Sequence, residues 1–201
     1  MKKYLIFTLT ILIFWSCKKP KEEPVLELIS YNWGRYDNYL NREGRDTIIP
    51  FLNCHIYAQI YKNGDCKLSQ NRGEYKNELY AKFKLDTIII NPALRIIQSI
   101  DKDTTMIRKT DIGCCIYDGP LIRLIGNNQK GEKHTIKFIH SNRSNLNLLN
   151  LYNSIESIAS KQNSNEELIH SKEKRIKEIY DSEFDSLPKY IIKSDIKFTA
   201  P

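Results

Sequence analysis

A chain of 201 residues is long enough for one domain of ordinary size together with a leader and tails. Apolar residues make up 41% and charged residues 27%, a balance that excludes a globally disordered chain. The formal net charge of +7 is spread along the chain, whereas phosphate binding needs a clustered basic face, so no nucleic-acid partner is expected.

The first sixteen residues have the three parts of an export signal. Lys2 and Lys3 form the charged end, residues 4–15 carry no charge, and Ser16 is the small residue at the cleavage position. A helix of these twelve uncharged residues would rise only about 18 Å, well short of the roughly 30 Å hydrocarbon core of a bilayer. We therefore expect a cleaved leader rather than a membrane-spanning helix.

Cys17 follows this leader directly. The stretch Phe14-Trp15-Ser16-Cys17 resembles the lipobox of bacterial lipoproteins, although Trp15 is bulkier than the usual small residue. The Ser-Cys-Lys-Lys ending, with the Ile-, Lys-, Asn- and Tyr-rich composition, is similar to lipoproteins of Bacteroidota. The resemblance implies a mature protein with three acyl chains on Cys17, and several chains hold a protein on a membrane where one binds only reversibly. The alternative is an ordinary secretory signal followed by an incidental cysteine.

The composition divides the chain into four segments. These are a signal peptide over 1–16, a lipidated and proline-stiffened tether over 17–24, an α+β domain over 25–160 and a C-terminal helical extension over 161–201. The resemblance implies a location in the cell envelope. Because Lys18 replaces the Asp that retains some lipoproteins at the inner membrane, we expect the outer membrane.

The first half of the domain predicts strands. Residues 25–29 form a short candidate strand, and residues 51–61 are rich in β-forming types. Asn63-Gly64 is the usual centre of a two-residue type I′ hairpin, and the return strand would cover 66–69. This register places Cys66 opposite Tyr61, which argues against a bridge to Cys54.

Residues 85–100 allow two interpretations. Three consecutive isoleucines at 88–90 favour a strand, but apolar residues also recur at helical spacing from Leu85 to Ile100. Asn91-Pro92 predicts a helix over at least 91–101, whereas a cap at Asp86 or Thr87 would start it earlier, with a kink at Pro92. The state of residues 85–90 stays open.

The second half repeats the order of hairpin and helix. Residues 114–125 and 133–140 predict an antiparallel hairpin, and Ser144 or Asn145 caps an amphipathic helix. The apolar stripe of that helix consists of Leu146, Leu149, Tyr152, Ile155, Ile158 and Ala159. A sparser helical pattern covers 166–184, and residues 190–198 could form an edge strand.

These elements predict an α+β fold. Two antiparallel hairpins form a sheet that two helices cover on one face, with a further C-terminal helix. The order of elements is similar to small domains of unknown function in Bacteroidota lipoproteins, through the segments 54–64 and 121–158. That likeness concerns topology alone and carries no chemistry.

Four cysteines remain after the leader, Cys54, Cys66, Cys114 and Cys115. In an oxidising compartment they allow up to two disulfides, with three connectivities. Cys114 and Cys115 would face opposite sides of a strand, so one of them could bridge to Cys54 or Cys66 while the other packs as a small hydrophobe. No CxxC pair or spaced histidine pair indicates a metal, and none is expected.

Motifs of the common catalytic and nucleotide-binding sites are missing from the sequence. It contains no GxGxxG, GxxxxGK[ST], GxSxG or HExxH, so neither a cofactor nor an enzymatic activity is expected. His55 stands beside Cys54, but neighbours on a strand point to opposite faces, which disfavours a catalytic pair. His134 and His140 are too far apart along one strand to share a metal.

An aromatic group is the strongest lead to a binding surface. Tyr31, Trp33, Tyr36 and Tyr39 alternate with polar residues and could stack on sugar rings or peptides. The alternative, which we favour, is that they pack against the sheet edge or the C-terminal helix. The charged run 172–175 could likewise contact acidic headgroups, but a solvated helix face is the better interpretation.

These observations predict an envelope lipoprotein that acts as a non-catalytic binding module for a protein or glycan partner. One alternative is an immunity or inhibitor lipoprotein directed against a periplasmic toxin. Another is an enzyme whose nucleophile is the thiolate of Cys114 or Cys115.

Overall fold

The computed structural model describes residues 22–36, 49–71, 78–106, 119–141, 144–158 and 166–183, and all structural statements below concern these residues. The predicted leader, Cys17, Tyr39, Cys114 and Cys115 lie outside them, as does the predicted strand over 190–198.

The described residues form one seven-stranded sheet and three helices. The elements in chain order are β1 (Leu26–Tyr36), β2 (Ile49–Ile60), β3 (Asp65–Asn71), β4 (Glu78–Lys84), α2 (Thr87–Gln98), β5 (Thr104–Thr105), β6 (Leu121–Asn127), β7 (Lys133–Ile139), α4 (Leu146–Glu156) and α5 (Glu166–Glu183). The strand order across the sheet is β4-β3-β2-β1-β6-β7-β5. Every neighbouring pair is antiparallel except β5 and β7, which run parallel.

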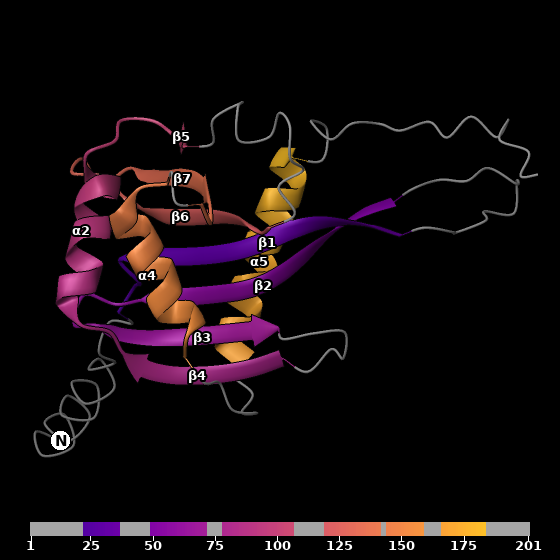
Figure 1. The fold of residues 1–201 in the computed structure, drawn as a ribbon, viewed down its shortest axis with the longest axis horizontal. Coiled ribbons are helices and arrows are strands. Elements are labelled where there is room, and N and C mark those ends of the chain that lie inside the picture. The colour runs from indigo at the N-terminus through magenta and orange to yellow at the C-terminus, as the bar shows by residue number, and fades with distance from the viewer. Residues whose placement is uncertain are drawn as a thin grey trace, which may run out of the picture.

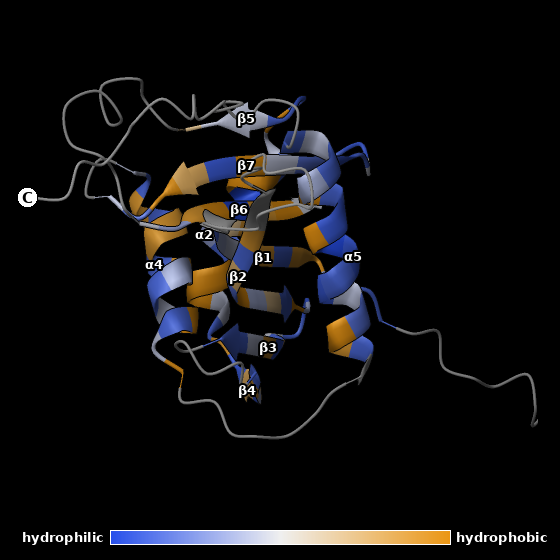
Figure 2. Cartoon of the chain, turned by 90° about the vertical axis from the view of Figure 1, so that its right-hand side faces the viewer, coloured by the Kyte–Doolittle hydropathy of each residue, from blue (hydrophilic) through white to orange (hydrophobic). Residues whose placement is uncertain are grey.

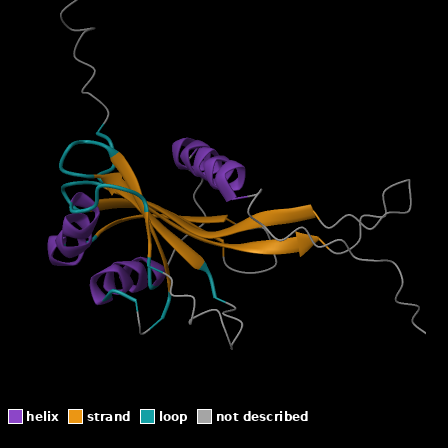
Figure 3. Cartoon of the chain, turned by 90° about the horizontal axis from the view of Figure 1, so that it is seen from above, coloured by secondary structure: helices purple, strands orange, loops and turns teal. Residues whose placement is uncertain are grey.

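The sheet lies between two helical layers. Helices α2 and α4 cover one face, and α5 packs on the opposite face (Figure 1, Figure 3). The α+β prediction is confirmed, including the two helices on one face and the additional C-terminal helix. The two predicted hairpins are present as β2–β3 and β6–β7, and β1 joins them by pairing with both β2 and β6. Strands β4 and β5, which were not predicted, extend the sheet at its two edges.

The turn between β2 and β3 differs from the prediction. Ile60 pairs with Cys66, and Tyr61 donates its backbone N–H to the carbonyl of Asp65, so the loop has three residues instead of two. Gly64 has a φ of 88° in this loop, which is the left-handed position of a type I turn with a bulge. The predicted pairing of Cys66 with Tyr61 is therefore wrong by one residue. The Asn-Gly pair signals a hairpin, but the turn type depends on where the strands pair.

Helix α2 settles the ambiguous segment after β4. It begins at Thr87, and its N-cap Asp86 accepts a hydrogen bond from the backbone N–H of Ile88 at 2.9 Å. Pro92 lies inside the helix, where its ring removes one backbone donor. The isoleucines are helical because the cap and the buried face formed by Ile90, Ala93 and Ile97 outweigh their β preference.

Helix α4 begins after the N-cap Asn145, one of the two predicted caps, and its side chain accepts from the backbone N–H of Asn147. The buried face consists of Leu148, Leu149, Leu151, Tyr152 and Ile155. Leu146 was predicted in this stripe but is 69% exposed. The predicted members Leu149, Tyr152 and Ile155 are buried, so only the first residue of the helix departs from the predicted stripe.

Each face of the sheet has its own hydrophobic core. The core under α2 and α4 is the larger one, and Leu28, Leu124 and Ile136 are fully buried in it. The core under α5 is smaller and contains Ile29, Tyr57, Leu168 and Ile179 among others. Helix α5 is correspondingly the most hydrophilic of the three helices (Figure 2). Polar interactions therefore supplement apolar packing on the α5 face, as described below.

Candidate functional site

A β-bulge in β2 assigns side chains to the two faces of the sheet. Ser30 pairs with Ile56 but Tyr31 pairs with Cys54, so His55 is an extra residue without a partner on β1. In a regular strand Cys54 and Ile56 would share a face. Here Ile56 belongs to the core under α4, whereas Cys54 belongs to the core under α5. The bulge also directs His55 into a cavity on the α4 side.

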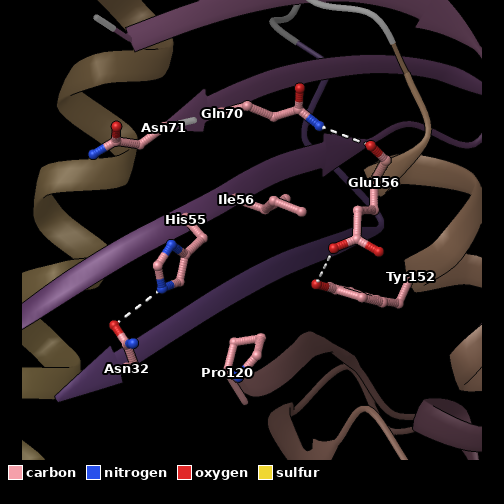
Figure 4. Close-up of a pocket in the computed structure, with 8 residues that line it drawn as sticks. All are labelled: Asn32, His55, Ile56, Gln70, Asn71, Pro120, Tyr152 and Glu156. Atoms are coloured by element: carbon pink, nitrogen blue, oxygen red, sulfur yellow. Dashed lines mark hydrogen bonds between the residues drawn. The ribbon is translucent and has the colours of Figure 1, made fainter. Parts of the chain in front are cut away.

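This cavity lies between the sheet and the C-terminal end of α4 (Figure 4). Its volume is about 520 Å³, within the range of pockets that bind small molecules. The described residues that line it come from three strands, one helix and the segment before β6: Asn32, His55, Ile56, Gln70, Asn71, Pro120, Tyr152 and Glu156. Most of these side chains are polar, which distinguishes the cavity from the apolar core beside it.

His55 is held by a neighbour on β1. Its Nε2 lies 3.0 Å from Oδ1 of Asn32. An amide oxygen only accepts hydrogen bonds, so the imidazole donates Nε2–H, and Nδ1 of the neutral ring becomes an acceptor. Burial lowers the pKa of His55 below its usual value and favours this neutral form. The bulge and the amide thus set both the orientation and the tautomer of the ring.

Gln70, Tyr152 and Glu156 form the opposite wall. Gln70 is buried, and its Nε2 donates to the backbone carbonyls of Ile155 and Glu156 at 3.5 and 3.3 Å. Tyr152 donates its hydroxyl to the carboxylate of Glu156 at 2.8 Å. The Tyr152 ring also packs against the ring of His140, with ring centroids 5.4 Å apart. The last turn of α4 is thereby fixed to β3 at the cavity wall.

Three further lining residues contribute differently. The side-chain amide of Asn71 points away from the other lining side chains (Figure 4), and its Oδ1 is buried without a hydrogen-bond partner. Pro120 and Ile56 supply apolar surface. The cavity therefore has a polar wall at α4, a polar wall at the bulge and an apolar portion between them.

The aromatic residues predicted as a binding patch do not line this cavity. Tyr31 is fully buried under α5 and donates its hydroxyl to Glu183 at 3.0 Å. Trp33 donates Nε1 to the same carboxylate at 3.0 Å and packs on Tyr180, with ring centroids 5.5 Å apart. Both follow the favoured alternative of packing against the C-terminal helix. The side chain of Tyr36 lies outside the described residues, as does Tyr39.

The predicted solvated face of the C-terminal helix is partly wrong. Lys172 and Arg175 both turn toward the sheet, where Lys172 pairs with Glu78 and Arg175 pairs with Glu27 of β1. Glu173 and Lys174 of the same run are exposed. The sequence pattern could not reveal this division, because the carboxylate partners stand on strands distant in sequence.

Cys54 and Cys66 lie in the cores on opposite faces of the sheet, and both are free thiols. Burial raises the pKa of Cys54 to about 11 and that of Cys66 to about 12. Both thiols are therefore neutral at physiological pH, which suits packing and not nucleophilic attack. The possible partners Cys114 and Cys115 lie outside the described residues.

Sequence reasoning missed the cavity residues, apart from mentioning His55 and placing Tyr152 in a helical stripe. Asn32, Gln70 and Glu156 carry no motif and are brought together from β1, β3 and α4. A polar residue at an inward position of a strand, such as Gln70 two residues after the buried Leu68, is the one local signal that could have indicated the site.

Comparisons with known proteins found no match to a family model, to a curated protein or to a solved structure. Among the described helices, none combines the length and apolar character needed to cross a membrane. In the same part of the chain, no group of three or more His, Cys, Asp or Glu side chains is arranged to hold a metal ion.

Proposed function

We propose that this chain is a lipid-anchored protein of the bacterial envelope whose folded domain binds a small polar ligand without transforming it. The observation that carries the proposal is the cavity of about 520 Å³ whose polar side chains are positioned by a bulge, an amide partner and a helix terminus. Its three titratable lining groups are held by hydrogen bonds, because His55 bonds the amide of Asn32 while Tyr152 and Glu156 bond each other.

The position of the cavity suits a tethered protein. The lipobox-like sequence at Cys17 supports a membrane anchor, and the tether leads directly into β1 at Leu26. Asn32 stands six residues further along this strand, about 20 Å away at the usual rise of a strand. A domain attached through its N-terminal segment would thus present the cavity at a distance from the attachment point.

The binding experiment compares two aromatic substitutions in the full-length protein. Asn32→Tyr places a ring in the cavity, whereas Asn91→Tyr adds the same ring on the exposed surface of α2. Each protein is purified from native envelopes, and the released small molecules are identified by mass spectrometry. We expect wild type and Asn91→Tyr to retain a common ligand that Asn32→Tyr lacks. Equal retention of the ligand by all three proteins would exclude the cavity as the binding site.

The anchor has a separate test. Mass spectrometry of the mature N-terminus should find Cys17 as the first residue, carrying acyl chains. An unmodified Cys17 in a protein released to the medium would contradict the envelope attachment, while leaving the cavity experiment unaffected.

A further inference from the structure

The N-terminal segment and the first turn of α2 lie at the same end of the sheet. Val25 donates its backbone N–H to the carbonyl of Ile60, the last residue of β2, at 2.9 Å. Gly64, just before β3, accepts from the backbone N–H of Leu85, also at 2.9 Å. Figure 1 shows α2 standing across the end of the sheet at which β1 begins. We call this part of the domain the tether end, and it consists of Val25 and residues 60–65 and 84–95.

The tether end carries an exposed isoleucine. Ile88 is 77% exposed in the first turn of α2, whereas Ile90 of the same helix is 2% exposed and belongs to the core. A single exposed aliphatic side chain is common on proteins and by itself indicates no partner. Its position beside the segment that leads to Cys17 is the second observation, because the lipobox-like sequence supports a membrane anchor there.

The charges around Ile88 favour an anionic surface. The cations of the tether end are exposed and belong to no ion pair between described residues: Lys62, Lys84 and Arg95. The end also has two carboxylates, Asp65 and Asp86, so its formal charge is three minus two, or +1. Residues 18–24 contain three lysines and two glutamates and add a further +1. The surface nearest the anchor is therefore modestly basic, which suits anionic lipid headgroups.

From these observations we infer that the tether end contacts the bilayer that holds the anchor, with Ile88 inserted among anionic headgroups. The inference rests on the proposed function, because it needs acyl chains on Cys17. Eight residues separate Cys17 from Val25, so the anchor lies at most about 29 Å from the domain. Such a short tether gives the domain a high effective concentration at the bilayer. One aliphatic side chain and a few cations then suffice, although they would not hold a free protein there.

This orientation directs the ligand cavity away from the bilayer. Strand β1 begins at the tether end with Leu26, and Asn32, which lines the cavity, stands six residues further along the strand. The cavity therefore lies toward the opposite end of the sheet. A contact between the tether end and the bilayer leaves it accessible from the aqueous side.

Leu146 provides a matched control for Ile88. It is 69% exposed and is the first residue of α4. Two residues earlier, the hydroxyl of Ser144 donates to the carbonyl of Ile139, which pairs with Leu121 of β6. That pair lies five positions along the strands from the tether end, about 17 Å at the usual rise. Leu146 thus resembles Ile88 in exposure but follows the opposite ends of the strands.

The experiment places the mature acylated protein in vesicles of phosphatidylethanolamine and phosphatidylglycerol whose acyl chains are either ordinary or brominated. Bromine quenches a tryptophan that touches the acyl chains. Ile88→Trp and Leu146→Trp each add one tryptophan, and wild type gives the contribution of Trp33. We expect brominated lipid to reduce the fluorescence of Ile88→Trp, with an emission shift to shorter wavelength, and to leave Leu146→Trp equal to wild type. Vesicles of phosphatidylcholine, which carry no net charge, should give a smaller loss.

Equal fluorescence of Ile88→Trp in ordinary and brominated vesicles, or equal losses in the two variants, would overturn the bilayer contact. Equal losses in phosphatidylglycerol and phosphatidylcholine vesicles would overturn the role of the cations. An unmodified Cys17 would overturn the proposed anchor and this inference with it. An acylated protein whose Ile88→Trp variant is not quenched would overturn the inference alone and leave the proposed function standing.

Discussion

Helix α5 is held on the sheet by a buried carboxylate, and removing its charge should destabilise the protein substantially. Glu183 is only 8% exposed and lies at the end of α5. It accepts hydrogen bonds from Arg123 at 2.5 Å, from Tyr31 and Trp33 at 3.0 Å each, and from Lys137. Burial alone would raise the pKa of Glu183, but the bonds from Lys137, Arg123 and Trp33 outweigh it and lower the pKa to about 2.

The expected loss of folding stability follows from the pKa shift of Glu183 and from the chemistry of buried ion pairs. One pKa unit corresponds to about 1.4 kcal/mol, so a shift from 4.5 to about 2 corresponds to about 3 kcal/mol. The lysine partner is partly exposed, and solvent screening reduces the contribution, so we expect about 2–3 kcal/mol. Glu183→Gln keeps the size of the side chain but leaves two cations without an anion, which is the costly way to break a buried pair.

Urea denaturation at pH 7 followed by circular dichroism measures this loss. Glu173→Gln is the matched control on the exposed face of the same helix, and its change should stay within about 0.5 kcal/mol. The pH dependence adds an independent check. The unfolded chain protonates Glu183 near its ordinary pKa, so the stabilisation is complete above about pH 4.5 and is lost as the pH falls toward 2. A decrease of less than about 0.5 kcal/mol in the free energy of unfolding of Glu183→Gln would refute this account of how α5 is held.

Three further outcomes are expected. Gly64→Ala should destabilise the protein by more than about 1 kcal/mol, because the left-handed conformation is combined with a backbone carbonyl 2.6 Å from the new Cβ. Gly131→Ala, with a φ of 81° and open space, should cost less, and equal losses in thermal melts would contradict the steric argument. Cys54 and Cys66 should resist iodoacetamide in the native protein at pH 7.5 and react after unfolding, as peptide mapping can detect. Asp86→Ala should cost about 1 kcal/mol in urea denaturation through loss of the N-cap of α2, and a neutral effect would contradict the role of the cap.

Much of the fold could be predicted because its signals are local. Asn145 caps α4, and the apolar period of residues 166–184 matches α5 closely. The errors concern contacts between distant segments. The loop at Gly64 was predicted one residue too short, and Leu146, which was placed in the buried stripe of α4, is exposed. Strand β4 was not predicted, because its position in the sheet depends on pairing with β3 and not on a local sequence signal.

The candidate site could be predicted only in part for the same reason. The bulge at His55 depends on how β2 pairs with β1, and one shifted residue decides which face each side chain reaches. The partners of His55 and Gln70 lie 23 and 85 or more residues away in sequence. No local pattern specifies such encounters.

The amino-acid sequence by itself determined the leader-like start, the cysteine that follows it, and the helices and hairpins whose periodicity comes from neighbouring residues. Only the tertiary structure decided that Lys172 and Arg175 turn inward, that Tyr31 is covered by α5, and that a polar cavity opens beside α4. The physical reason is that backbone preference acts over a few residues, whereas burial and pairing depend on the segments that chain topology brings together.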